Sequence, residues 1–309
     1  MVNQISIPEG LIWNCPSRQQ IIRIQSDIVS KKDLLDRLAF QQKRLRIPGR
    51  TELVLELSSP SMLKNFSNAR CFGPRIRLLI SDDQIAEIHK RRFHFHLIRP
   101  TLVLNHCKGS LPRIIQFLAS LNLPIEVNPN VFIDQDKKTL LDLAERLLLS
   151  PFVKTPVQPF FNLLLFAMNS QVNSLPTLWD TCNESVGQNY FITNGGKITL
   201  SRRWSDRNRF FGDISDTIHD VRSSRFFREL KSTNDPVATE NSKCYKCRVF
   251  LFCSGYLCAL DSTHDCSPFK SLYDFMSSHS QSLKESFIAL PKQKKQDVFQ
   301  AIEMPIQNQ

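Results

Sequence analysis

The sequence predicts a mixed α/β fold followed by a small cysteine-rich part near the C-terminal end of the chain. Two observations lead to this prediction. Short apolar runs alternate with helical patterns between residues 51 and 149, which is typical of a sheet with parallel strands. Five of the nine cysteines then fall within residues 244–266. The 309 residues, 41% of them apolar, suffice to bury one large core or two moderate ones.

The elements of the first half follow from apolar periodicity and from residues that break regular structure. Helical patterns predict helices over residues 17–28 and 31–46, before a Pro-Gly pair at 48–49 interrupts the chain. Residues 52–57 (ELVLEL) and 75–80 (RIRLLI) are each expected as a strand. The pattern then predicts a helix over 82–92, extended chain over 93–104, a helix over 111–121, extended chain over 125–133 and a helix over 138–149.

The last third of the chain has a different pattern. Residues 189–200 (NYFITNGGKITL) predict a β-hairpin, because the Asn-Gly-Gly at 194–196 tolerates the positive φ that tight turns need. A short helix that carries Phe226 and Phe227 follows, and then a polar linker. The linker leads directly into the cysteine-rich segment.

The spacing of the clustered cysteines indicates a metal site. Thiolates are strong ligands for soft metals, and a C-x2-C pair brings two of them to one ion or one cluster edge. The pair is followed by further cysteines after five, four and seven residues, so the candidate ligands are Cys244, Cys247, Cys253, Cys258 and Cys266.

A disulfide knot is the competing explanation for these cysteines. It is disfavoured because the first residues show no secretory signal and because disulfide frameworks belong mostly to small secreted chains. The other four cysteines are scattered, as thiols are in a reducing compartment: Cys15, Cys71, Cys107 and Cys182. The longest apolar run is too short to cross a bilayer. We therefore expect a cytoplasmic protein with no membrane partner.

The charge of the chain favours anionic partners. There are 40 basic and 29 acidic residues, which gives a formal net charge of +11. The basic residues are spread over many segments, and no block has the density of a nucleic-acid-binding arm.

The hairpin NGGKI, the helix entry FGDISDTIHDVRSSRFFREL and the C-x2-C-x5-C run together resemble the SPASM domain over residues 186–270. This domain is the auxiliary iron–sulfur module of many radical-SAM peptide and protein maturases. The resemblance implies one [4Fe–4S] cluster held by Cys244, Cys247, Cys253 and Cys266. Cys258 follows a gap of four residues where the family has three. It is either an additional thiol or the fourth ligand in place of Cys266.

The sequence departs from the family at two places. The family's second auxiliary cluster uses a G-x4-C arrangement, and counting from Gly196 places Ser201 at the cysteine position. The radical-SAM signature C-x3-C-x2-C falls on Ser61, Asn65 and Asn68, which are poor cluster ligands. We therefore expect a partial, degenerate radical-SAM-like (β/α) barrel that does not cleave S-adenosylmethionine.

The expected organisation has four parts. They are an N-terminal helical segment (1–50), the degenerate radical-SAM-like α/β domain (51–185), the SPASM-like iron–sulfur domain (186–285) and a C-terminal tail (286–309).

The resemblance also suggests a role. The chain is similar to the SPASM-only maturases of grasp-with-spasm systems, which act beside an ATP-grasp enzyme. It would then support the maturation of a ribosomally made peptide or protein by recruiting the precursor or relaying electrons. Its expected partners are that precursor and a modifying enzyme of the ATP-grasp or radical-SAM type. It would not be an active radical-SAM enzyme by itself.

A zinc ion is the alternative metal, since four cysteines with C-x2-C pairing also build zinc knuckles. The chain would then be a zinc-stabilised basic protein that binds nucleic acid or a protein partner.

Two minor candidate sites remain. A second metal site would use His94, His96, His106 and Cys107, and a peptide-binding helix face would use Arg222, Arg225 and Arg228.

Overall fold

The fold was analysed in a computed structural model of the whole chain. The structure describes residues 20–25, 51–61, 63, 75–90, 95, 98–133, 135–149, 155–168, 176–213, 215–233, 244 and 246–289. The predicted helix over 31–46 and the signature positions Asn65 and Asn68 lie outside these residues, as do Cys15 and Cys71.

The strands of the described residues form one sheet. They are β1 (Gln20–Gln25), β2 (Thr51–Leu57), β3 (Arg75–Ser81), β4 (Thr101–His106), β5 (Ile125–Val127), β6 (Val157–Gln158), β7 (Asn189–Ile192), β8 (Lys197–Thr199) and β9 (Gly212–Asp213). Their order across the sheet is β6-β5-β4-β3-β2-β1-β7-β8-β9. The strands from β6 to β7 in this order are parallel, whereas β8 and β9 extend the sheet in antiparallel pairing. The fold is therefore mixed α/β with a parallel sheet and a small antiparallel edge.

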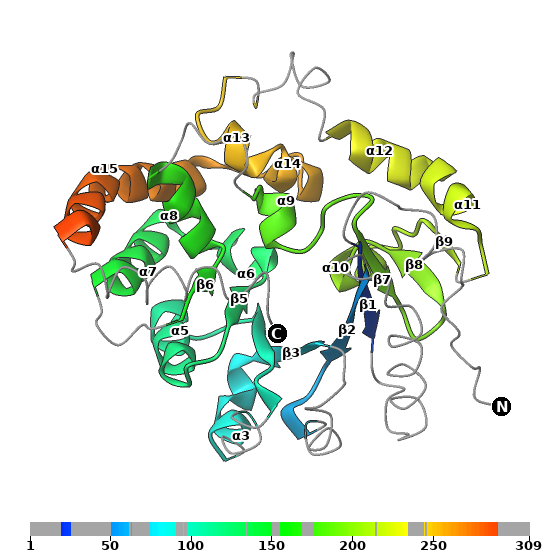
Figure 1. Ribbon diagram of the computed structural model, residues 1–309, viewed down its shortest axis with the longest axis horizontal. Coiled ribbons are helices and arrows are strands. Elements are labelled where there is room, and N and C mark those ends of the chain that lie inside the picture. Colours follow the sequence, from blue (N-terminus) through cyan, green and yellow to red (C-terminus); the bar gives the residue numbers. More distant parts are fainter. Residues whose placement is uncertain are drawn as a thin grey trace.

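Along the chain, some helices lie between strands and the others follow the last strand. They are η3 (Asp82–Gln84), α3 (Ile85–Lys90), α5 (Leu111–Ser120), α6 (Pro129–Ile133), α7 (Lys137–Leu149), α8 (Phe160–Met168), α9 (Leu178–Thr181), α10 (Arg202–Asp206), α11 (Ile218–Ser223), α12 (Arg225–Thr233), α13 (Phe250–Cys253), α14 (Tyr256–Leu260) and α15 (Ser267–Ala289). Figure 1 shows α7, α8 and α15 side by side, and the long helix α15 contacts both of the others.

The two faces of the parallel sheet differ in chemistry. One face is apolar and almost fully buried in the main hydrophobic core, through residues such as Leu55, Leu57, Leu78, Leu102 and Leu104. The other face carries charged side chains that are also buried: Arg23, Glu56 and Arg77 are 2%, 4% and 8% exposed. Because successive side chains of a strand point to opposite faces, a charged residue within an apolar strand lands on this second face.

Most of the predicted elements are confirmed by the structure. The strands over 52–57 and 75–80 and the helices over 111–121 and 138–149 are present within one or two residues. Ser81 is the N-cap of the 3-10 turn η3, which leads into α3. The predicted hairpin is β7 and β8, with Phe191 opposite Thr199.

Three element predictions are wrong. Extended chain was expected over 93–104, but Phe95 and Ile98 are helical, and β4 begins only at Thr101. A helix was expected over 17–28, but residues 20–25 form β1 at the centre of the sheet. Three isoleucines in QIIRIQ favour a strand, because β-branched side chains fit the pleated surface better than the helix. Extended chain was expected over 125–133, but only Ile125–Val127 is a strand, and α6 begins at Pro129. Proline is favoured in the first turn of a helix.

Candidate functional site

The five clustered cysteines line a single cavity of about 330 Å³. All five are half-buried thiols rather than disulfides. The cavity is also lined by Val249, Phe250, Leu257 and Phe269, and by His264 and Asp265. The structure thus brings together every cysteine that the sequence singled out in residues 244–266.

Local backbone geometry positions these cysteines around the cavity. The amide of Cys247 donates to the carbonyl of Cys244 (N···O 3.0 Å), which closes a turn around the C-x2-C pair. Ser254 (φ 47°) and Gly255 (φ 73°) are both left-handed and separate α13 from α14. This reversal lets Cys253, at the end of α13, and Cys258, within α14, line the same cavity.

The arrangement of the thiols bears on which metal they fit. Among the described residues, no three Cys, His, Asp or Glu side chains converge closely enough to hold one ion. The sulfur atoms of Cys244 and Cys258 are 3.4 Å apart. Five thiols around a cavity of this size, rather than around one point, suit a polynuclear cluster, whose irons each take their own thiolate. Thiolates are ligands of both iron–sulfur clusters and zinc, so this donor set could serve either.

The thiol of Cys253 is held in a setting that opposes its ionisation without a metal. Burial raises the pKa of Cys253 to about 12; the amide of Leu257 lowers it, and Cys258, Cys244 and Cys247 raise it further. A bound cation would reverse this balance, because metal ligation requires and stabilises the thiolate. Loading of the site should therefore release protons.

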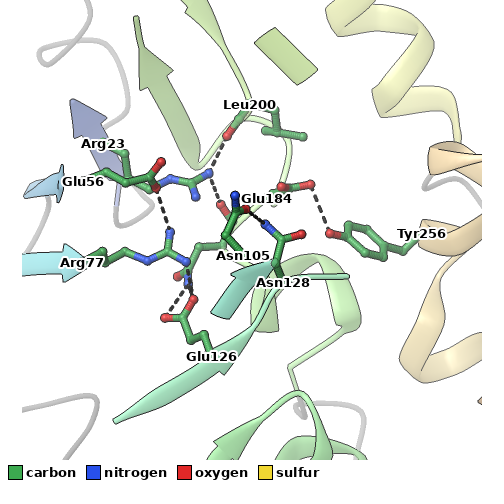
Figure 2. A network of polar contacts seen from close by, with 10 residues as sticks. Arg23, Glu56, Arg77, Asn105, Glu126, Asn128, Glu184, Leu200 and Tyr256 are labelled. Carbon is green, nitrogen blue, oxygen red and sulfur yellow. Dashed lines mark hydrogen bonds and ion pairs between the residues drawn. The ribbon is translucent and has the colours of Figure 1, made fainter. Parts of the chain in front are cut away.

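A second site, which the sequence analysis did not identify, lies on the charged face of the sheet. A polar cavity of about 40 Å³ lies against this face. Figure 2 shows Arg23, Glu56 and Arg77 from three neighbouring strands pointing toward one another, with Glu126 of β5 beside Arg77. Arg77 makes an ion pair with Glu126 and a longer one with Glu56 (3.7 Å). Arg23 donates to the carbonyls of Leu200 (2.5 Å) and Asn183 (2.7 Å).

Glu184 forms the other half of this polar centre. It makes a buried ion pair with Arg203 and accepts from the indole N–H of Trp204 (2.9 Å) and from the hydroxyl of Tyr256 (3.2 Å). Burial alone would raise the pKa of Glu184, but the charges of Arg203 and Arg23 outweigh it and hold the pKa below its ordinary value. Glu184 is thus a buried carboxylate stabilised by two guanidinium groups.

Tyr256 links the polar centre to the cysteine cavity. It belongs to α14, between Cys253 and Cys258, and its hydroxyl also accepts from Arg203. Its ring packs edge-on against Trp179 at 4.8 Å between centroids, and Trp179 donates its indole N–H to the carbonyl of Ser254 (2.9 Å). The segment that carries the cysteines therefore contacts Glu184 and Arg203 of the polar centre directly.

The sequence did contain a signal for the polar centre. A charged residue interrupts the apolar pattern within each of four strands, at Arg23, Glu56, Arg77 and Glu126. These residues have alternating sign along the chain. Charged side chains within strands of a buried parallel sheet have to pair with one another, because an isolated buried charge is costly.

Of the two minor candidates, the second metal site is described only in part and the arginine face is not assembled as expected. His106 and Cys107 lie at the end of β4, but His94 and His96 lie outside the described residues. The helix expected to carry Arg222, Arg225 and Arg228 is interrupted at Ser224, whose ψ of 147° is extended. Arg222 therefore belongs to α11 and the other two to α12. The prediction of one helix face that carries all three arginines is therefore wrong.

Comparison of the chain with protein-family models, with curated proteins and with solved structures finds no match in any of the three. In the part of the chain that the structure describes, no helix has both the length and the apolar composition needed to span a membrane.

Proposed function

We propose that this chain is an iron–sulfur protein of the SPASM type that takes part in the maturation of a ribosomally made peptide or protein. Cys244, Cys247 and Cys253, with Cys258 or Cys266, would hold one [4Fe–4S] cluster. The observation that carries the proposal is the single cavity of about 330 Å³ that all five cysteines line. A cluster held there would supply one-electron transfer.

The surroundings of the cysteines suit this role. Phe252 and Phe269 stack with ring centroids 6.4 Å apart next to the cavity, and Leu257 and Val249 line it. Such an apolar shell excludes water and lowers the local dielectric constant. Both effects change the reduction potential of a cluster.

The parallel sheet supports the second half of the proposal, a partial radical-SAM-like barrel. Strands β1 to β6 are hydrogen-bonded in chain order, which is the order in the wall of a (β/α) barrel. The position of the first signature cysteine is Ser61, whose hydroxyl lies 2.8 Å from that of Ser59. Since serine is a poor cluster ligand, the proposed role is that of an accessory subunit that recruits precursor or relays electrons beside a modifying enzyme.

The test is metal analysis of protein purified without oxygen, combined with its visible spectrum. About four irons and four sulfides per chain, with a band that bleaches on reduction, are expected. Cys244→Ala, Cys247→Ala and Cys253→Ala should each lose the iron. The matched control is Cys107→Ala, because Cys107 is a half-buried thiol that does not line this cavity. Comparing Cys258→Ala with Cys266→Ala identifies the fourth ligand. Full iron in all three cluster variants would rule out the site.

One observation favours zinc as a second candidate. Two thiolates on a tetrahedral zinc ion with Zn–S bonds of about 2.3 Å lie roughly 3.8 Å apart, and the contact of Cys244 with Cys258 at 3.4 Å is close to that value. One zinc per chain in a colourless protein would replace the iron–sulfur proposal. The chain would then be a zinc-stabilised basic protein, and its binding to nucleic acid should weaken steeply with salt.

A further inference from the structure

A larger groove at the carboxyl ends of the parallel strands shares part of its wall with the polar cavity. The groove has a volume of about 540 Å³ and is lined by the end of β4 (Asn105, His106, Cys107) and by α10 and the residues beside it. Asn105, Arg202 and Arg203 line both the groove and the polar cavity. The carboxyl edge of a parallel sheet is where α/β folds bind ligands, because the loops there leave a crevice.

The walls of the polar cavity offer more hydrogen-bond donors than acceptors. Five guanidinium nitrogens lack a hydrogen-bond partner among the described residues: Arg23 Nε, Arg77 Nε, Arg77 Nη1, Arg203 Nε and Arg203 Nη1. Only two buried carboxylate or amide oxygens of the lining residues lack one, Glu56 Oε1 and Gln158 Oε1. A buried donor without a partner costs free energy, so the site favours a ligand that brings acceptor oxygens.

The charge of the lining selects a ligand with one negative charge. Four arginines and three glutamates line the polar cavity, which leaves a net charge of +1: Arg23, Arg77, Arg202 and Arg203 against Glu56, Glu126 and Glu184. Its volume of about 40 Å³ is room for roughly three water molecules at the 10–15 Å³ that each requires. A carboxylate group, with one charge and two acceptor oxygens, matches both the charge and the size.

We propose that the groove and the polar cavity form a binding site for an acidic segment of a peptide, with one Asp or Glu side chain inserted beside Arg203. The groove holds the flanking residues, and the inserted carboxylate accepts from the guanidinium groups. The identification of the peptide as the precursor in a maturation reaction rests on the proposed function. The binding of a carboxylate in the polar cavity does not depend on the proposed function.

The test compares three probe peptides by NMR titration of the full chain. They are acetyl-Gly-Glu-Gly-amide, acetyl-Gly-Gln-Gly-amide and acetyl-Gly-Gln-Gly with a free C-terminal carboxylate. The Glu peptide should bind at least about tenfold more tightly than the Gln amide, because only it carries a charge that pairs with the arginines. Equal binding of these two, or no binding of either, overturns the proposal. Binding of the free-terminus peptide alone overturns the assignment to a side chain.

Asn105→Asp tests the location. Asn128 donates its side-chain amide to the Asn105 oxygen (2.9 Å), and an aspartate accepts this bond equally well, so the local structure is kept while a negative charge is added to the shared wall. The Glu peptide should then bind about tenfold more weakly. Asn122→Asp is the matched control, because Asn122 is exposed after α5 and lines neither cavity. Equal effects of the two variants would overturn the proposal.

Metal content is measured in the same samples, which separates the two proposals. Tight binding of the Glu peptide by a zinc-containing or metal-free chain would leave the carboxylate site standing and remove the iron–sulfur function. An iron-loaded chain that binds none of the probe peptides would leave the iron–sulfur function standing and remove the carboxylate site.

Discussion

Glu184 holds the buried polar centre together at the level of single residues. It is 4% exposed and accepts from Arg203, Trp204 and Tyr256, which come from α10 and α14. A buried ion pair of this kind adds little net stability relative to an apolar pair, because desolvation offsets the attraction. Removing one partner of the ion pair lowers the stability of the fold strongly, because the other charge is then buried without a counter-charge.

Glu184→Gln should therefore lower the free energy of unfolding by about 3–5 kcal/mol, since Arg203 keeps its charge without a counter-charge. The measurement is urea unfolding at neutral pH. Glu145→Gln is the matched control; Glu145 is exposed on α7, and its replacement should change stability by less than about 0.5 kcal/mol. Similar small changes in both variants would show that the pair is not buried in solution.

The carboxylate of Glu184 should also make the free energy of unfolding depend on pH. The pKa of Glu184 is below its ordinary value in the folded chain, so its contribution to stability is present above the unfolded pKa of about 4.3 and is lost as pH falls through the folded pKa. The difference in unfolding free energy between the natural chain and Glu184→Gln should thus shrink from pH 6 toward about pH 3. Urea titrations across this range measure it. A difference that stays constant, or that grows on acidification, contradicts the prediction.

At the level of elements, the turn between α13 and α14 controls where two of the five cysteines lie. Gly255 has a φ of 73°, and an alanine there costs about 1–2 kcal/mol because its Cβ meets the backbone in the left-handed region. Gly255→Ala should lower stability by that amount and reduce metal retention. Thermal unfolding and metal analysis of the purified variant measure both effects.

The hairpin between β7 and β8 provides the control for this turn. Gly195 lies outside the left-handed region, and an added Cβ would find its nearest atom, Thr193 Oγ1, at 3.9 Å. Gly195→Ala should be neutral or stabilise the chain by up to about 1 kcal/mol. If both alanine variants lose stability equally, backbone strain at Gly255 is not the reason.

The sequence predicted those elements whose signals are local. The hairpin β7–β8 has its Asn-Gly-Gly turn, and α5 and α7 have their apolar stripes, so each was placed within one or two residues. Strand β1 was missed although its three isoleucines favour a strand, and its pairing partners β2 and β7 lie farther along the chain. The spacing of the cysteines indicated that they act together, and all five line one cavity.

The polar centre is non-local, which is why it was not predicted. Arg77 and Glu126 belong to β3 and β5, which are separated in the sheet by β4, and Arg203 and Tyr256 come from helices beyond the strands. No spacing rule connects such residues. The charged residues within apolar strands indicate buried ion pairs, but only the sheet order shows which of them share a face.

At the scale of the whole molecule, the cysteine-rich segment and the α/β part share one core. Strands β7 to β9 continue the sheet from β1, and α15 packs on α7 and α8. Phe252 beside the cysteine cavity lies 5.6 Å, between ring centroids, from Phe166 of α8, and Phe269 lies 6.1 Å from Phe132 of α6. A change at the cysteines therefore reaches the α/β core through direct aromatic contacts.

Metal removal should accordingly lower one unfolding transition of the whole fold rather than create a second one. A metal held by the cysteines, as proposed above, would bind only the folded site, so its loss would remove binding free energy from the native state. Because the core is continuous, far-UV and near-UV circular dichroism should report the same, lower midpoint. Chelator added to Cys244→Ala, which lacks the metal from the start, should leave its midpoint unchanged. A low transition that moves with metal, beside a high one that does not, would instead mean that the cysteine-rich segment folds as an independent unit.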